Sequence, residues 1–208
     1  MLYTPSYAMP RDTAAIHDLI RRYSFATVIS SGTQGLVISH LPLLLDAMGG
    51  PQGKLIGHLA RANSHSKLLA DAPVTCIFHG PHGYLSPAWY VDQLSVPTWN
   101  YAVAHVQGQS RLIEDTAHIE EILAATVDKH EAAAGTGWRY DLPTEFRERL
   151  VKTIVGFEIE ITSLEGKFKL SQNRKGADKS AALAGAAEHY ATTNPDLVRM
   201  MREALCSD

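Results

Sequence analysis

The sequence predicts a mainly β protein of the α+β class, with antiparallel strands that form a barrel and helices at its periphery. Two observations lead to this prediction. Runs rich in β-branched and apolar residues recur along the chain, and short turns that contain glycine separate many of them. Such short connections favour antiparallel pairing, because a parallel pair needs a crossover of about a dozen residues or more. We expect about six or seven strands.

The N-terminal part of the chain is predicted to form a helix followed by an antiparallel meander. Asp12 is a good N-cap residue, and apolar residues recur at helical spacing from there to Arg22. Strands are expected at residues 25–30, 36–45 and 54–59. Tight turns with glycine join these strands. Pro42 has no main-chain N–H group, so we expect it at a sheet edge or a bulge.

The rest of the chain is predicted to alternate strands with helices. Strands are expected at residues 74–79, 84–86, 98–107, 111–113 and 156–163. Helices are expected at residues 64–70, at 116–131, from Pro143 onward and along the alanine-rich tail that follows Lys175. Apolar and acidic residues alternate from Phe157 to Ile161, which is typical of a strand with one buried face. Asn194 and Pro195 predict a capped helix in the tail.

Composition excludes several classes of protein. The net charge of −3 argues against nucleic-acid binding by bulk electrostatics, although it leaves a local basic patch open. No apolar run approaches the roughly 20 residues that span a bilayer, and the N-terminus lacks the plan of a signal peptide. We therefore expect a soluble cytoplasmic protein that does not bind membranes. Cys76 lies in an apolar run and is expected to be a buried free thiol.

Four polar segments at strand edges are the candidate binding residues. They are Ser39-His40-Leu41-Pro42, Gly57-His58-Leu59-Ala60-Arg61-Ala62-Asn63, Pro97-Thr98-Trp99-Asn100-Tyr101 and Lys169-Leu170-Ser171-Gln172-Asn173-Arg174. Each mixes a ring or an apolar residue with hydrogen-bond donors. Such segments suit one flat aromatic ligand that bears an anionic tail.

The second of these segments is the candidate anion site. A strand ends near Leu59 and a helix begins near Ser64, so Arg61 and Lys67 would lie beside the free N–H groups of a helix start. The same pattern is also typical of an ordinary capped surface helix with a solvated lysine, and both interpretations stay open.

The third and fourth segments have similar alternatives. Trp99 and Tyr101 share one face of a strand, while Asn100 faces the other way. The aromatic side chains could stack on the ring of a ligand, or Trp99 could be a core residue of the sheet. Lys169 and Asn173 would point the same way if that segment were extended, but a solvated loop is equally in keeping with the sequence.

Motifs for most catalytic chemistries are absent from the sequence. It contains no GxSxG, GxGxxG or GxxxxGK[ST] pattern, and its histidines do not have metal-ligand spacing. No metal site is expected. No catalytic residue is identified. His40, His58 and Tyr101 are candidate acids or bases only because their side chains could reach a bound ligand. In the tail, Arg199 and Arg202 could belong to a helix-turn-helix, but acidic neighbours offset them.

The chain resembles the PaiB family, described as FMN-binding negative transcriptional regulators, from about Met1 to Leu183. The motifs that carry the resemblance are Phe25-Ala26-Thr27, residues 39–46, 57–63 and 96–101, Gly80-Pro81-His82, Ser86-Pro87-Ala88-Trp89-Tyr90, Ile154-Val155-Gly156-Phe157-Glu158-Ile159 and Gly166-Lys167-Phe168-Lys169-Leu170-Ser171-Gln172-Asn173-Arg174. The resemblance implies a split β-barrel like that of pyridoxine-phosphate oxidase, with FMN as cofactor. It also implies a homodimer with two flavin sites across the interface. The split-barrel domain would span residues 1–175, and a helical extension at 176–208 would pack on the barrel or on the partner.

The resemblance also implies the residues that contact FMN. These are Ser39, His40, Leu41, His58, Leu59, Ala60, Arg61, Asn63, Lys67, Trp99, Asn100, Lys169, Gln172 and Asn173. The segment 58–67 would hold the ribityl phosphate, and the residues from Trp99 onward would close the site, partly from the other subunit. Family members often have Asn-Pro-Gln-Trp where this chain has Asn63-Ser64-His65-Ser66, so the phosphate or rim contact is expected to differ in detail.

The resemblance leaves several functions open. The protein is expected to be a flavin-dependent redox protein, an FMN-dependent oxidoreductase among them, or a flavin-responsive regulator. A repressor that binds DNA with flavin as effector is a second alternative. A haem-binding or haem-degrading protein is a third, because related split barrels handle haem.

Overall fold

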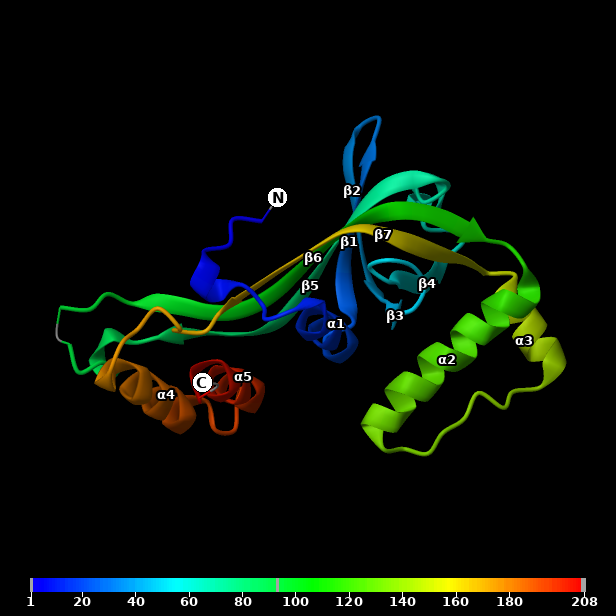
Figure 1. The fold of residues 1–208 in the computed structure, drawn as a ribbon. Coiled ribbons are helices and arrows are strands. Elements are labelled where there is room, and N and C mark those ends of the chain that lie inside the picture. Colours follow the sequence, from blue (N-terminus) through cyan, green and yellow to red (C-terminus); the bar gives the residue numbers. More distant parts are fainter. Residues whose placement is uncertain (1, 93, 207–208) are drawn as a thin grey trace. The chain divides into compact units, whose positions relative to one another are not determined.

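The computed structural model describes residues 2–92 and 94–206 (Figure 1). Met1 of the family resemblance and the last two residues of the expected C-terminal extension lie outside this part of the chain. The described strands are β1 (Phe25–Gly32), β2 (Gly35–Pro42), β3 (Leu44–Asp46), β4 (Lys54–Ala60), β5 (Ala72–Leu85), β6 (Thr98–Ile113) and β7 (Ile154–Lys169). The described α-helices are α1 (Thr13–Arg22), α2 (Thr116–Ala134), α3 (Thr144–Val151), α4 (Ala177–Tyr190) and α5 (Pro195–Cys206). Short 3₁₀ helices cover Ser6–Ala8, Ser64–Leu68 and Pro87–Trp89.

The seven strands form one sheet in the order β2-β1-β5-β6-β7-β4-β3. The pairs β1–β2, β1–β5, β3–β4 and β4–β7 are antiparallel. The predicted mainly β, antiparallel class is therefore confirmed, but the sheet ends at β2 and β3 and is not closed. The predicted meander is confirmed only in part. The predicted strand 36–45 is divided into β2, which pairs with β1, and β3, which pairs with β4, and the other edge of β4 pairs with β7. Hydrophobic periodicity shows which face of a strand is buried but does not show which strand pairs with it.

Strands β1 and β2 form a hairpin whose register fixes the position of Ser39 opposite Val28. The turn connects Gly32, the last residue of β1, to Gly35, the first residue of β2. At Gly35 φ is +116°, a backbone conformation that favours glycine. Pro42 ends β2, which is an edge strand, so its missing N–H group removes no central ladder bond. The predicted edge position of Pro42 is confirmed.

Strands β5, β6 and β7 are longer than predicted, with 14, 16 and 16 residues. Glycines that suggested turns lie inside two of these strands because a neighbour approaches closely. A Cβ atom at Gly108 would lie 2.3 Å from the main-chain oxygen of Glu160. A Cβ atom at Gly83 would lie 2.6 Å from the Leu197 side chain. Both positions therefore need glycine for packing rather than for a turn.

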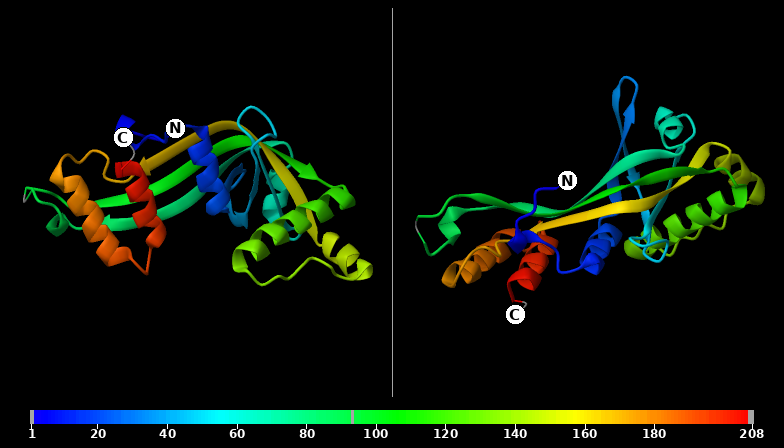
Figure 2. Two further views of the ribbon diagram at one scale, coloured as in Figure 1. Left: turned by 60° about the horizontal axis from the view of Figure 1, so that its bottom comes forward. Right: turned by 45° about the horizontal axis from the view of Figure 1, so that its top comes forward.

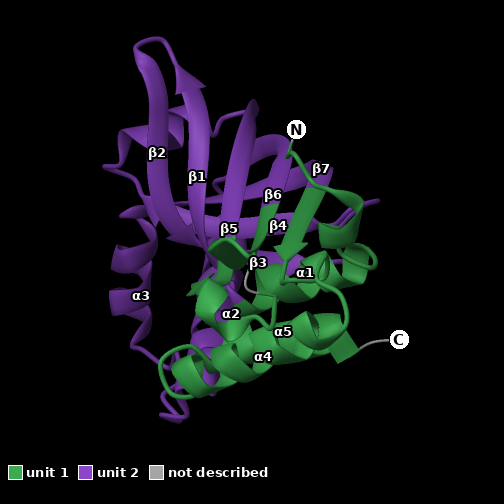
Figure 3. Ribbon diagram, turned by 90° about the vertical axis from the view of Figure 1, so that its left-hand side faces the viewer, with its two compact units in different colours: residues 1–22, 79–104, 165–208 green, residues 23–78, 105–164 purple. Residues whose placement is uncertain are grey.

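The chain divides into two compact units (Figure 3). Unit 1 contains Met1–Arg22, His79–Ala104 and Glu165–Asp208, and unit 2 contains Tyr23–Phe78 and His105–Leu164. In unit 2, α2 and α3 bury an apolar cluster formed by Ile113, Ile119, Ile122 and Val151. In unit 1, helices α1, α4 and α5 lie along one face of the strand segments, and α4 and α5 are neighbours (Figures 1 and 2).

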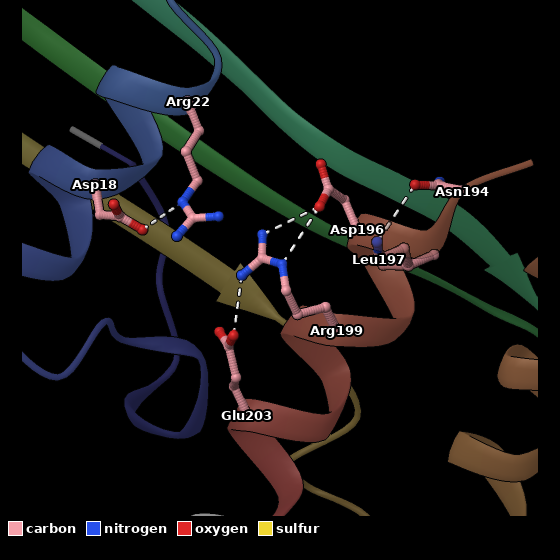
Figure 4. A network of polar contacts seen from close by, with 7 residues as sticks. All are labelled: Asp18, Arg22, Asn194, Asp196, Leu197, Arg199 and Glu203. Atoms are coloured by element: carbon pink, nitrogen blue, oxygen red, sulfur yellow. Dashed lines mark hydrogen bonds and ion pairs between the residues drawn. The ribbon is translucent and has the colours of Figure 1, made fainter. Parts of the chain in front are cut away.

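Two predicted helix starts are confirmed in unit 1. Asp12 accepts a hydrogen bond from the N–H of Ala15 at 2.8 Å, and Asn194 accepts one from Leu197 at 3.3 Å. In α5, Arg199 pairs with Asp196 at 3.3 Å and with Glu203 at 2.9 Å, as Figure 4 shows. The arginine charge is therefore balanced within its own helix.

A buried carboxylate in unit 2 makes the stability of the fold sensitive to acid. Glu158 accepts hydrogen bonds from Lys54 at 2.8 Å and from Arg111 at 3.0 Å. Burial raises the pKa of Glu158, but the hydrogen bonds and charges of Lys54 and Arg111 outweigh burial and hold the pKa below 4.5. The carboxylate therefore contributes stability above pH 4.5, and this contribution is lost as the pH falls through the lowered pKa.

We expect Glu158→Gln to lower the free energy of unfolding by about 1–2 kcal/mol at neutral pH, because it leaves two cations without a carboxylate. This difference should shrink in urea unfolding curves recorded below pH 4.5. Glu160→Gln, at an exposed residue on the same face of β7, is the matched control and should change little. A Glu158→Gln deficit that stays constant from neutral pH to pH 3 would contradict the assigned pKa direction.

Candidate functional site

A chain of buried polar side chains joins β1, β2 and the segment after β4 in unit 2. His65 is fully buried between two serines, with Nδ1 2.9 Å from Ser39 Oγ and Nε2 2.9 Å from Ser30 Oγ. Asn63 Nδ2 donates to Ser39 Oγ at 3.2 Å. One ring nitrogen of neutral His65 donates and the other accepts, so the two hydroxyls can satisfy both. These bonds fix the segment that carries the candidate anion site.

The short helix predicted at residues 64–70 is a 3₁₀ helix, Ser64–Leu68. Asn63 caps it by accepting a hydrogen bond from the N–H of His65 at 3.0 Å. The Ser66 hydroxyl donates to the main-chain oxygen of Asn63 at 2.8 Å. A turn this short, with one N–H already capped, has little macrodipole, so an anion here must be held by side chains.

Arg61 is exposed, but its guanidinium is held in place by main-chain oxygens. Its Nε donates to Lys152 at 3.2 Å and its Nη2 donates to Ile154 at 2.9 Å. The main-chain N–H of Arg61 also donates to Thr153 at 2.8 Å. These oxygens carry no net charge, so they do not neutralise the guanidinium. Among the described residues no hydrogen bond to its Nη1 is found, and Nη1 can therefore donate to a ligand.

Several other predicted flavin contacts lie in unit 2. Lys67 is exposed, and no ion pair to it is found among the described residues. His40 is exposed, with Nδ1 3.3 Å from Thr27 Oγ1. Leu59 is buried, Leu41 is half-buried, and Ala60 ends β4 in an exposed position. Lys67 and His40 are therefore free to meet a ligand.

His58 lies on the side of the sheet that α2 covers. It is opposite Gly156 in the β4–β7 register, and a Cβ atom at Gly156 would meet the apolar side chains of Ile119 and Ile122. Burial lowers the pKa of His58. Its Nδ1 is buried and makes no hydrogen bond to any residue that the structure describes. The predicted role of His58 in phosphate binding stays a prediction.

The buried His65 should couple the stability of unit 2 to pH. Burial lowers the pKa of His65 from 6.5. As the pH falls below 6.5, the unfolded chain therefore takes up a proton before the folded chain does, and stability decreases. We expect His65→Gln to be less stable than wild type at pH 7.5. The gap should narrow by up to about 1.4 kcal/mol for each pH unit below 6.5, in urea unfolding curves. A gap of equal size at pH 5.5 and pH 7.5 would contradict the neutral state of this imidazole.

The remaining predicted contacts lie in unit 1, where two of them have structural roles. Asn100 is fully buried and bonds to the Ser171 hydroxyl at 3.0 Å. Gln172 accepts from the N–H of Leu170 at 2.7 Å and donates to the main-chain oxygen of Phe168 at 2.6 Å. Both side chains hold the end of β7 in shape.

The other three predicted contacts in unit 1 are accessible. Trp99 is 48% exposed, and Asn173 is exposed. Lys169 donates to the main-chain oxygen of Trp99 at 2.9 Å and to the hydroxyl of Thr98. The structure therefore brings together the third and fourth candidate segments of the sequence within unit 1.

Sequence reasoning did not single out Ser30, His65 or Lys167 as members of these clusters. His65 appeared as a change from the family pattern, and its serine partners lie 26 and 35 residues away along the chain. Only the alternating burial of β1 and β2, which places Ser30 and Ser39 on the inner face, could have indicated a buried polar partner.

An exposed apolar face covers the outer side of the β1–β2 hairpin. Phe25, Leu36 and Ile38 are 65%, 67% and 53% exposed. Ile38 is opposite Ile29 in the register, so these side chains share one face. A groove of about 420 Å³ adjoins this face and is lined by Ile29, Leu36 and residues of β5 and β6. We call Phe25, Ile29, Leu36 and Ile38 the hairpin face.

None of the helices formed by the described residues has the length and apolar character that crossing a bilayer requires.

Comparison with known proteins places this chain in a family. The family model described as "Putative FMN-binding domain" matches residues 1–163. Protease synthase and sporulation protein PAI 2 of Bacillus subtilis is 31% identical over 179 residues, which cover 85% of each protein. The chain belongs to this FMN-binding family. The uncharacterized protein AN0679 of Emericella nidulans is 31% identical over 184 residues, covering 71% of this chain and 73% of that protein. The predicted family is confirmed, and its cofactor is the predicted FMN.

Solved structures confirm the split-barrel type of fold. The FAD and heme binding protein from Mycobacterium smegmatis has a TM-score of 0.60 and 15% identity, over 86% of this chain and 80% of that one. The flavocytochrome Anf3 from Azotobacter vinelandii has a TM-score of 0.59 and 14% identity, over 84% and 73%. At these identities the likeness concerns the fold alone.

Proposed function

We propose that this member of the FMN-binding family is a homodimeric flavoprotein in which Arg61 and Lys67 of unit 2 hold the FMN phosphate. The observation that carries the proposal is a pair of exposed cations that flank the anchored Asn63 turn. No ion pair to either is found in the described part of the chain. A phosphate dianion would be the negatively charged partner of these two cations.

The side chains present fit such a group. The guanidinium of Arg61 is already oriented by Lys152 and Ile154, so little side-chain entropy is lost when it binds phosphate. The bonds among Asn63, Ser39 and His65 hold the turn between the two cations in one conformation. FMN, when bound, supplies the electron-transfer chemistry, and these residues supply position and charge.

The hairpin face supports the homodimer. Exposed apolar side chains that gather on one face mark a protein–protein contact more often than scattered single ones do. A second copy of the chain is the occupant that the family resemblance implies. It would cover Phe25, Leu36 and Ile38 and would close the adjoining groove of about 420 Å³.

The role of the bound flavin is the less specific part of the proposal. A redox protein and a flavin-responsive regulator both need the same FMN site. The DNA-binding and haem-binding alternatives, the cytoplasmic location and the extension at 176–208 stay predictions. The contacts of Arg199 with Asp196 and Glu203 do not favour DNA binding, because they balance the charge of that arginine.

The family resemblance assigns further residues to the flavin, partly from the partner subunit. In unit 1 they are Trp99, Asn100, Lys169, Gln172 and Asn173. In unit 2 they are Ser39, His40, Leu41, His58, Leu59, Ala60 and Asn63. These assignments stay predictions.

A comparison of FMN with riboflavin tests the proposal, because the two ligands differ only in the phosphate. Binding is followed by the quenching of flavin fluorescence. We expect the dissociation constant of FMN to be at least about 100-fold below that of riboflavin, since riboflavin lacks the phosphate that makes two charge-assisted contacts. Equal affinities for the two ligands, or no FMN binding at micromolar concentrations, would overturn the proposal.

A further inference from the structure

The strand segments of unit 1 have one covered face and one open face. Gly83 and Leu85 of β5 are buried, and Gly83 lies against Leu197 of α5 and Tyr190 of α4. Figure 1 shows the helices along this side. Side chains of a strand alternate between faces, so His82 and Tyr84 lie on the open face. Both are exposed.

The open face carries a group of aromatic rings around Trp99. His82 stacks on Trp99 with ring centroids 5.9 Å apart and an interplanar angle of 27°. Tyr84 meets Trp99 edge-on at 6.3 Å. Trp99 is 48% exposed and Tyr84 43% exposed, so ring surface is left for a further planar group. Offset stacking on such a surface suits an aromatic ligand.

Cations lie beside these rings. Lys167 and Lys169 are two residues apart in β7 and share one face. Lys169 bonds to the main-chain oxygen of Trp99 at 2.9 Å, and the ammonium of Lys167 lies 5.6 Å from the ring centroid of Tyr101. The open face therefore combines ring surface with positive charge.

In the part of the chain that the structure describes, no carboxylate forms an ion pair with these cations. Lys167 donates to the main-chain oxygen of Tyr3 at 2.8 Å, and Arg174 donates to the Ser95 hydroxyl at 3.2 Å. In the described structure none of Lys167, Lys169 and Arg174 forms an ion pair. Burial, and then the charges of Lys167 and Arg174, lower the pKa of Lys169. A bound anion would relieve this repulsion.

We propose that this face of unit 1 binds a second ligand besides FMN, a planar aromatic molecule with a phosphate or carboxylate group. The ring lies against Trp99, and the anionic group lies at Lys169. Lys167 is buried and Arg174 lies over the Tyr90 ring at 3.9 Å, so these two contribute through their charges. Neither rings nor cations alone select this class, whereas their combination favours aromatic anions over neutral rings and over simple anions. The proposal assigns Trp99 and Lys169 to this second ligand, in place of the flavin contacts that the family resemblance implies for them. It uses residues of unit 1 alone and does not depend on the FMN phosphate site in unit 2.

The test uses adenosine 5′-monophosphate as the aromatic anion, adenosine as the ring alone and ribose 5-phosphate as the anion alone. Each is titrated into ¹⁵N-labelled full-length protein, with and without saturating FMN, while the indole N–H signals of Trp89, Trp99 and Trp138 are followed by NMR. We expect the Trp99 signal to shift, with an affinity for the nucleotide at least about tenfold above that for either fragment. The signal of Trp138, an exposed tryptophan of unit 2, is the internal control and should not move.

Variants separate the two parts of the site. Lys169→Met should weaken nucleotide binding about tenfold and leave adenosine binding unchanged, because it removes charge and no ring. Lys179→Met, on α4, makes the same change of net charge away from the open face and should have no effect. Trp99→Leu should weaken both the nucleotide and adenosine.

Three results would overturn the proposal. They are equal nucleotide affinity in Lys169→Met and wild type, no shift of Trp99, and loss of nucleotide binding when FMN is saturating. The last result would assign the open face to the flavin itself. Failure of FMN to bind counts against the proposed function alone, because the titration without FMN still tests the open face.

Discussion

A double variant, Arg61→Met with Lys67→Met, is expected to bind FMN at least about 100-fold more weakly than the wild-type protein. Each side chain contributes a charge-assisted contact worth about 1.5–3 kcal/mol, and about 1.4 kcal/mol corresponds to a tenfold change in affinity. The loss is expected for FMN and not for riboflavin, because riboflavin has no phosphate for these cations. Flavin fluorescence titrations with both ligands measure the effect.

The control for this variant carries the same change of net charge elsewhere in unit 2. Arg139→Met with Lys129→Met should leave FMN affinity within about twofold of wild type, since long-range electrostatics is screened by salt at physiological ionic strength. Circular dichroism establishes that both proteins fold, because Arg61 also bonds to Lys152 and Ile154. If both double variants lose FMN equally, the phosphate is not held by Arg61 and Lys67.

The second large effect is expected at the hairpin face. Leu36→Lys with Ile38→Lys should convert the protein from a dimer to a monomer of 22.8 kDa, because two unpaired charges would have to be buried in an apolar contact. Light scattering coupled to gel filtration measures the mass. In the folded monomer these positions are exposed, so the unfolding temperature should change little beyond the loss of dimer contacts.

Met48→Lys is the matched control for the dimer. Met48 is 91% exposed, in the connection between β3 and β4, so the same kind of substitution should leave the mass unchanged there. A wild-type protein that is already a monomer, or a hairpin-face variant that stays a dimer, would show that the contact between copies lies elsewhere.

Local signals in the sequence predicted the helices well. Asp12 and Asn194 cap α1 and α5 as expected, because capping depends on residues only three positions away. The long strands were harder. Gly83 and Gly108 suggested interruptions, but each lies where a neighbouring chain segment approaches too closely for a side chain. That neighbour is far away in sequence, so no local pattern indicates it.

The candidate site shows the same limit. The resemblance and the polar spacing singled out Arg61, Lys67, Trp99 and Lys169, and the structure leaves these side chains accessible or only partly covered. The supporting contacts could not be predicted. His65 is enclosed by serines from two strands of a hairpin, and this enclosure depends on how the segment after β4 folds back onto them. The sequence also does not predict that the helix after β4 is a short 3₁₀ turn, because that packing, rather than helix propensity, sets its length.

The most direct measurement for the central claim is a crystal structure of the protein with FMN bound. We predict that the FMN phosphate lies within hydrogen-bond distance of the Arg61 guanidinium and the Lys67 ammonium. A phosphate seated instead at Lys167, Lys169 and Arg174, or one that contacts no cation, would contradict it.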